Sequence, residues 1–392
     1  MTARDSGLTW RFPQAFWTAN LVELLERAAW YGVFVSVTLY LSRILAYSDR
    51  EAAITSGLFS AGLYFLPTFS GAYADRMGYR RALMLAFGLL SVGYAGMWVL
   101  PTLLQNAGLV HYGMPAAGSP DADAVGKMIE YTGLEGSWQR WLFVPVMMVV
   151  MLGGSFIKSV ITGTVARETN EVNRARGFSI FYAMVNIGAF GGKTIVKPLR
   201  MSLGDEGFIV LNLFAASMTL LALILVAAFY RSGHHETTAK SAAETWQALK
   251  AVFRQGRLIT LILIITGFWM VQGQLYASMP KYVLRMVGEG ASPSWLANVN
   301  PAAVVLTVGF ITQLMARRTA LFSMTVGMFI MPVSALWMAA SNLTDGSPIL
   351  GMHPVTFMMI VGIAFQGVAE SFISPRFLEY FSLQAPKGEE GM

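Results

Sequence analysis

The sequence predicts an all-α integral membrane protein with about ten transmembrane helices. Two features of the composition lead to this fold class. Hydrophobic residues make up 55% of the 392-residue chain and charged residues only 13%, roughly half the share in soluble domains, and the mean hydropathy is +0.53. The third observation is a series of apolar segments near the roughly 20 residues that a membrane-spanning helix needs. These segments lie at 13–42, 52–74, 80–101, 140–165, 174–199, 205–230, 257–287, 295–316, 319–341 and 354–382.

Basic residues between the segments indicate the orientation of the chain. Arg76, Arg80 and Arg81 follow the second segment, and Arg317 and Arg318 follow the eighth. Because cytoplasmic loops carry an excess of Lys and Arg, we expect both ends of the chain to be cytoplasmic. This topology accounts for the net charge of +6, and no nucleic-acid partner is expected. Three basic residues on the expected outer side weaken the bias: Lys193, Lys197 and Arg200.

Two long connections organise the chain. Residues 102–138, rich in Gly, Pro and acidic residues, are expected outside as a solvated loop, whereas 231–256 lie inside. In the inner connection, Trp246, Leu249 and Val252 fall at helical spacing, which predicts a short amphipathic helix on the membrane surface, or a simple tether. We therefore expect three parts: a six-helix bundle over 1–230, a cytoplasmic linker over 231–256 and a partial bundle of four helices over 257–392.

Several chemistries are excluded by composition. The chain has no cysteine and only four histidines, and none of the histidines forms a ligand pair within an apolar segment. No glycine loop with a following basic residue is present that would bind phosphate. We expect no metal, no organic cofactor and no enzymatic activity.

The first segment carries charges where charges are costly. Glu23, Glu26 and Arg27 occupy positions i, i+3 and i+4, so their side chains project from one helical face. Each charge near mid-span costs on the order of 2.5–3.5 kcal/mol. Two interpretations stay open: a site that exchanges a proton, or a static ion network that fixes the packing.

Two further charged residues lie deep in apolar segments. Lys158 is a candidate partner for the two glutamates, and protonation of one glutamate would leave a cation available to a substrate carboxylate. Glu370 in the last segment is expected to pair with Lys158 or Arg27 as a gate, or to bond a neighbouring backbone group.

A loop motif between the second and third segments resembles that of the major facilitator superfamily. It reads Gly71-Ala-Tyr-Ala-Asp75-Arg76-Met-Gly78-Tyr-Arg80-Arg81. The resemblance implies a fold of two helical bundles with twelve helices, of which six plus four are expected here because the chain ends where the eleventh would begin. It also implies that these motif residues take part in gating between the bundles.

Narrower motifs resemble the proton-dependent oligopeptide transporter family. Glu23-Leu-Leu-Glu26-Arg27 is similar to its helix-1 motif, and Phe181-Tyr182-Ala-Met-Val-Asn186-Ile-Gly188 to its helix-5 signature. The resemblance implies that Glu23, Glu26, Arg27 and Lys158 couple transport to protons. It also implies substrate-binding roles for five residues: Tyr31, Asn186, Trp269, Gln274 and Glu370.

Two positions depart from the family pattern. Phe34 stands where the family usually has an arginine that meets the peptide carboxylate, and Gly273 stands where a glutamate often precedes the helix-7 glutamine. Both departures bear on peptide specificity rather than on proton coupling.

The sequence therefore predicts a proton-coupled symporter of di- and tripeptides or a related small solute, working by alternating access. Protons are the coupling ion. We expect a multi-pass protein of the inner or plasma membrane, monomeric, with a small-molecule or short-peptide substrate and the lipid bilayer as partners. The alternatives are a symporter of a non-peptide carboxylate or amino-acid-like solute, and a non-transporting membrane sensor.

Overall fold

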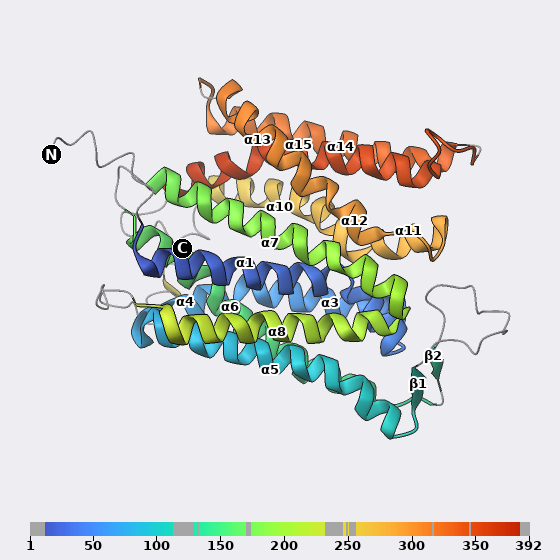
Figure 1. Ribbon diagram of the computed structural model, residues 1–392. Coiled ribbons are helices and arrows are strands. Elements are labelled where there is room, and N and C mark those ends of the chain that lie inside the picture. The colour runs from blue at the N-terminus through green and yellow to red at the C-terminus, as the bar shows by residue number, and fades with distance from the viewer. Residues whose placement is uncertain are drawn as a thin grey trace. The chain divides into compact units, whose positions relative to one another are not determined.

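The structure is a computed structural model in which long helices dominate (Figure 1). It describes residues 12–112, 129–131, 133–169, 174–231, 246, 247, 250, 256–315, 317–344 and 346–384. The chain forms two compact units, residues 1–250 and 251–392. Most of the predicted linker helix lies outside the described residues.

The first unit is built from helices that follow the predicted segments closely. Its long helices are α1 (Gln14–Phe34), α3 (Asp49–Phe65), α4 (Pro67–Met77), α5 (Tyr79–Asn106), α6 (Phe143–Arg167), α7 (Arg174–Leu203) and α8 (Glu206–Phe229). Within this unit α1 packs along α7 and α8, and α5 packs on α6 and α8 (Figure 1). Because α1 lies at the centre of the unit, most of its side chains are enclosed by the neighbouring helices.

The first predicted segment is not one continuous helix. After α1 the chain turns at Val35 and Ser36, resumes as α2 (Val37–Leu39) and then forms a π-helix over Tyr40–Ile44. Arg43 in the π-helix pairs with Asp205 before α8 at 3.2 Å. The Tyr40 hydroxyl donates to the Met97 carbonyl at 2.6 Å. These contacts hold the irregular end of the segment against α5 and α8.

Prolines divide two of the predicted segments. Pro67 opens α4 directly after α3, and Pro280 lies in the first turn of α11, after α10 has ended at Ala277. Proline is tolerated at these positions because the first turn of a helix has no use for its missing N–H. Pro332, by contrast, lies inside the continuous helix α14.

The outer connection contains structure that the sequence analysis did not predict. Helix α5 continues to Asn106, and the strands β1 (Val110–Tyr112) and β2 (Ile129–Tyr131) form an antiparallel pair in which His111 lies opposite Glu130. The Tyr112 hydroxyl donates to the Ile44 carbonyl at 2.7 Å. The solvated loop expected over 102–138 thus contains a helical end and a strand pair in its described residues. Tertiary contact with the first segment stabilises a pair too short to persist alone.

The second unit contains α10 (Gly256–Ala277), α11 (Met279–Val287), α12 (Pro293–Ala297), α13 (Val299–Leu314), α14 (Ala320–Ala339) and α15 (Pro354–Gln384). Within it, α15 packs against α13 and α14. The cluster of Phe268, Met331, Ala369 and Ile373 forms a core between α10, α14 and α15.

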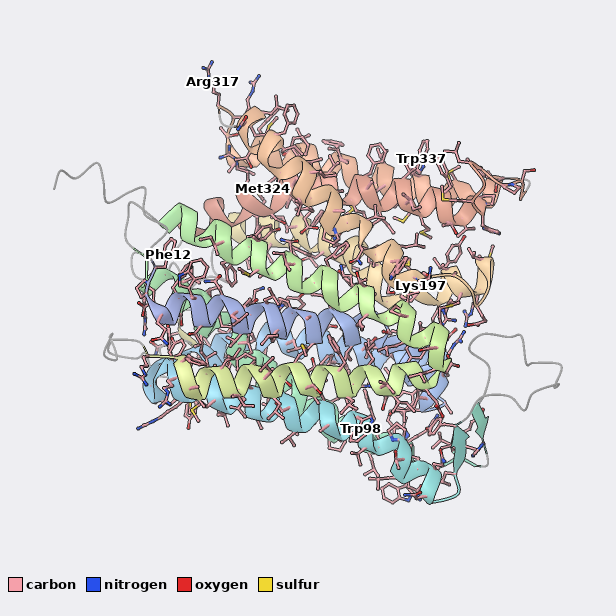
Figure 2. The ribbon with its side chains drawn as sticks, viewed as in Figure 1. Phe12, Trp98, Lys197, Arg317, Met324 and Trp337 are labelled. Carbon is pink, nitrogen blue, oxygen red and sulfur yellow. The ribbon has the colours of Figure 1, made fainter. Side chains whose placement is uncertain are left out.

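Eight helical spans among the described residues are long and apolar enough to cross a membrane. Helix α1 is not among them, since its three charges lie within every window of spanning length, and neither is α7. Large apolar side chains lie exposed on the spanning helices, for example Trp98 on α5 and Trp337 on α14 (Figure 2). Exposed rings of this kind on apolar helices are what a lipid-facing surface requires.

Helices α1 and α7 approach closely because two glycines face α1. A β-carbon on Gly188 would lie 2.3 Å from the Leu24 carbonyl oxygen, and one on Gly192 would lie 2.2 Å from the Ala28 carbonyl oxygen. Next to them, Gly191 has open space. In lipid the hydrophobic effect does not drive helices together, so they associate through close packing. Small residues on one face of a helix allow the two backbones to approach each other.

We predict that Gly192→Ala destabilises the first unit, whereas Gly191→Ala does not. The added methyl at 192 must push α7 away from α1, and overpacking of this kind typically costs about 1–3 kcal/mol. Thermal unfolding of the two purified variants in detergent measures the difference. Equal midpoints for both variants would contradict the packing described here.

Candidate transport site

The first cluster of charged residues lies on α1. The Arg27 Nε lies 3.2 Å from the Glu23 Oε1, and the Arg27 guanidinium also pairs with the Glu26 Oε2. Glu23 and Glu26 are only 4% and 3% exposed. Leu and Ala neighbours favour the helix that sets the i, i+3, i+4 spacing. One guanidinium thus holds two buried carboxylates.

Glu23 has one carboxylate oxygen with nothing to bond. Its Oε2 is buried and has no hydrogen-bond partner in the described part of the chain. A buried acceptor without a partner is costly, and more so when it carries charge. Protonation would remove the charge from this carboxyl, so the geometry provides a place for a proton.

Lys158 lies on α6, within electrostatic range of both Glu23 and Arg27. Its Nζ lies 5.6 Å from the centre of the Tyr64 ring, a cation–π contact. No carboxylate of the described residues lies within the 4.0 Å of an ion pair with Lys158. The side chain is exposed, so this charge is available to a partner other than the two glutamates.

Helix α7 contributes a buried cation that the sequence analysis did not select. Lys193 is 2% exposed, and its Nζ lies 4.9 Å from the centre of the Tyr31 ring on α1. Lys193 was expected among the basic residues of the outer side. Lys193 has the same sequence feature as Lys158, namely a charge within an apolar segment.

Asn186 is half-buried on α7, and its amide donates to the Tyr182 carbonyl one turn earlier at 2.8 Å. This bond within α7 leaves the side-chain oxygen of Asn186 as an acceptor. Tyr31 of α1 also lies at the interface between α1 and α7, where its ring contacts the Nζ of Lys193. Their roles in substrate binding stay predictions.

The second unit has a polar cluster of its own around Glu370. Gln272 on α10 and Asn300 on α13 both donate to the Glu370 Oε2, at 3.1 and 3.2 Å. Gln272 and Asn300 are each 6% exposed. Glu370 was predictable from its charge within an apolar segment, whereas the roles of Gln272 and Asn300 were not, because neither amide carries a charge.

The two other predicted residues of α10 lie elsewhere on that helix. Trp269 is 45% exposed and meets Phe268 edge to face. Gln274 is exposed and accepts from the Ser278 hydroxyl at 2.7 Å. Neither side chain joins Gln272 at the Glu370 carboxylate. The expected pairing of Glu370 with Lys158 would join the two units, and it stays a prediction.

The loop motif forms the turn between α4 and α5. Gly78 adopts φ 84°, a conformation that favours glycine, and allows the reversal. A β-carbon on Gly71 would lie 3.2 Å from the Ser159 side chain, so α4 and α6 pack closely there. Arg80 donates to the Ala227 carbonyl of α8 at 2.7 Å. Arg76 and Arg81 are exposed, and the Asp75 side chain lies outside the described structure.

Among the residues that the structure describes, no group of three or more His, Asp or Glu side chains is arranged to hold a metal ion. The polar groups of the two clusters are carboxylates, amides and cations. They suit the binding of protons and of zwitterionic or anionic solutes.

Comparison with known proteins places the chain in a family. The family model described as Major Facilitator Superfamily matches residues 19–392. Together with the long apolar helices, this match defines a multi-pass membrane transporter. The chain belongs to the Major Facilitator Superfamily.

Its curated relatives include two peptide permeases. It is 25% identical to the dipeptide and tripeptide permease B of Xenorhabdus bovienii, over 93% of this chain and 79% of the permease. It is 22% identical to the dipeptide and tripeptide permease A of Escherichia coli, over 91% of this chain and 78% of that one.

Solved structures share the fold. A structure reported for substrate recognition in proton-dependent oligopeptide transporters superposes with a TM-score of 0.68 at 18% identity, covering 96% of this chain and 86% of that one. A peptide transporter in complex with sulfate gives a TM-score of 0.66 at 18% identity, covering 95% and 83%.

We predict that Glu370→Leu lowers the stability of the second unit more than Glu370→Gln. Leucine removes the acceptor and leaves the Gln272 and Asn300 amides buried without it, at a typical cost of about 1–3 kcal/mol for each unsatisfied group. Glutamine keeps an oxygen that can take the place of Oε2 and accept both bonds. Thermal unfolding in detergent compares the variants, and a Glu370→Leu protein as stable as the parent would rule out the bonding described.

Proposed function

We propose that the protein is a proton-coupled symporter of di- and tripeptides or a closely related small solute. It resides in the inner or plasma membrane with its N-terminus in the cytoplasm, uses protons as the coupling ion and works by alternating access. The permease relatives and the fold shared with proton-dependent oligopeptide transporters support this proposal.

The observation that carries the proposal is the sharing of Arg27 by two buried glutamates. Their two negative charges are balanced by Arg27 and by Lys158, which lies within electrostatic range of Glu23. A proton on one glutamate leaves the cluster with an excess cation. The excess is available to a solute carboxylate, so proton binding and solute binding favour each other, which is the requirement for symport.

The driving force is adequate for concentrative uptake. One positive charge that moves through a membrane potential of 100 mV releases about 2.3 kcal/mol, before any pH gradient is added. After the solute has left, Arg27 and Lys158 can pair with both glutamates again only once the proton has been released. In this proposal Lys158 alternates between the α1 glutamates and Glu370, which closes the inner gate.

The first test is transport by the purified protein in liposomes that hold a pH-sensitive dye. We predict that dipeptides added under an inside-negative potential acidify the interior, because each solute enters with at least one proton. A dipeptide amide, which lacks the carboxylate, should acidify it much less.

Liposomes without protein give the background, and a peptide symporter of known activity shows that the assay works. Peptide binding without acidification would indicate a membrane sensor instead. Acidification by other carboxylates alone would indicate a different solute.

We predict that Glu23→Gln and Glu26→Gln each abolish concentrative, proton-driven uptake but retain exchange of solute across the membrane. A glutamine preserves size and polarity at the α1 cluster, but it neither takes up nor releases the proton. Counterflow of labelled dipeptide measures the exchange.

Glu135→Gln is the matched control, since Glu135 lies exposed in the outer connection and should leave both activities unchanged. Full concentrative uptake by both α1 variants would show that these carboxyls do not carry the coupled proton.

A further inference from the structure

Helix α1 carries a buried amide one turn before the charged cluster. Asn20 is 0% exposed, and its side-chain nitrogen donates to the Phe16 carbonyl of the same helix at 2.8 Å. Its side-chain oxygen, Oδ1, is buried and has no hydrogen-bond partner among the described residues. A buried acceptor in this condition costs free energy that an apolar side chain at the same place would not cost.

The orientation of this amide is fixed by the Phe16 carbonyl. A carbonyl oxygen only accepts hydrogen bonds, so the arm of the Asn20 amide that faces it must be the nitrogen. The oxygen therefore occupies the opposite arm of the planar group. A flip of the amide would lose the bond to Phe16 and would set two acceptors against each other. Oδ1 of Asn20 is thus held ready for a donor that is not among the described groups in their present protonation state.

Glu23 has a matching unpaired oxygen on the same face of α1. Asn20 and Glu23 are three residues apart, and side chains at this spacing are neighbours whose β-carbons lie about 5–6 Å from each other. The Glu23 Oε1 faces Arg27, whereas Oε2 is buried and lacks a hydrogen-bond partner among the described residues. Two acceptors cannot bond each other. One proton on Oε2 would make that oxygen a donor to Oδ1 and would give both atoms a partner.

Charged groups on the neighbouring helices also act on Glu23. Besides Glu23, the titratable groups within the apolar parts of the helices around the α1 cluster are Glu26, Arg27 and Tyr31 on α1, Lys158 on α6, Tyr182 and Lys193 on α7, and Tyr94 on α5. Helix α8 has none between Glu206 and Tyr230. Arg27 and Lys158 lie within electrostatic range of Glu23, and so does Glu26. Their charges act on the whole carboxyl group, whereas an acceptor beside Oε2 acts on the proton held by that one atom.

We propose that Asn20 accepts a hydrogen bond from the coupled proton and thereby holds that proton on the Oε2 of Glu23. The inference rests on the proposed function and deepens it, because it names the atom that carries the proton and the residue that positions it. Loading forms one O–H bond on Glu23 with a proton from the outer aqueous phase. Release breaks that bond, returns the proton to water on the cytoplasmic side and leaves the carboxylate to Arg27.

The test follows the protonation of Glu23 by infrared difference spectroscopy of the purified full chain as a function of pH. A protonated carboxyl has a carbonyl band of its own, and the part of this band that is absent in Glu23→Gln belongs to Glu23. Asn20→Leu keeps the branching of the side chain but has no acceptor. We expect it to move the midpoint of the Glu23 titration about one pH unit lower, which is a roughly tenfold weaker binding of the proton, because the bond to Oδ1 is lost. The pH at which proton-driven dipeptide uptake is half-maximal should move in the same direction.

Asn212→Leu on α8 is the matched control. Asn212 is 1% exposed, donates to the Phe208 carbonyl at 3.0 Å and has an Oδ1 that likewise lacks a partner among the described residues. Its neighbour Leu211 lies beside Gly32 of α1, and Gly32 is about 13.5 Å along the helix axis from Glu23. The control therefore removes the same chemical group at a distance from the proton, and it should leave the Glu23 titration unchanged.

Asn20→Thr tests whether any acceptor at this position is sufficient. A threonine hydroxyl can donate to the carbonyl four residues earlier, as Thr18 does to Gln14 at 2.9 Å, and its oxygen still accepts a bond. The midpoint should return most of the way to that of the unaltered protein. Thermal unfolding establishes which variants are folded, and Asn20→Ala, which also lacks an acceptor, replaces Asn20→Leu if the leucine variant does not fold.

The outcomes separate this inference from the proposed function, because the titration requires no transport. An unchanged midpoint in the variants that lack an acceptor would overturn the role of Asn20 and leave peptide symport intact. An equal shift in Asn212→Leu would overturn it as well, and the absence of any band that depends on Glu23 would overturn the placement of the proton. A shifted midpoint in a protein that moves no dipeptide would support the proton site and overturn the symport proposed above.

Discussion

The burial of two carboxylates beside one guanidinium on α1 is the constraint around which the first unit is arranged. Three charges near the middle of a membrane span are tolerated only where protein surrounds them. Helix α1 therefore has to run between α7 and α8. Gly188 and Gly192 make this possible, because a larger side chain at either position would meet the backbone of α1.

Acidic side chains within the helices bond to different partners in the two units. In the first unit the partner is a cation, and the ion pairs are short and shared. In the second, Glu370 is held by two neutral amides, Gln272 and Asn300. Amide partners hold a carboxyl in position without cancelling its charge. In the first unit, by contrast, the positive charge of Arg27 offsets part of the charge of Glu23 and Glu26.

Much of the fold was predictable because a lipid environment makes the pattern simple. Long apolar segments become helices, and the ion pair of Arg27 with Glu23 follows from the i, i+4 spacing of a helix. The contacts of neutral polar residues were harder to predict from the sequence. Gln272 and Asn300 come from different helices, and only tertiary packing brings them to one oxygen of Glu370. The strand pair of the outer connection was missed for a related reason, since its stabilising contact is with Ile44, distant along the chain.

The π-helix over Tyr40–Ile44 has a consequence for how the sequence of the first segment can vary. A π-turn accommodates one residue more than an α-turn and shifts the angular phase of everything beyond it. A residue gained or lost in this turn would be absorbed there. The face that carries Glu23, Glu26 and Arg27 would keep its orientation within the first unit, while the end bearing Arg43 would change its register. Insertions in this segment are thus expected to cluster in one turn and to spare the charged face.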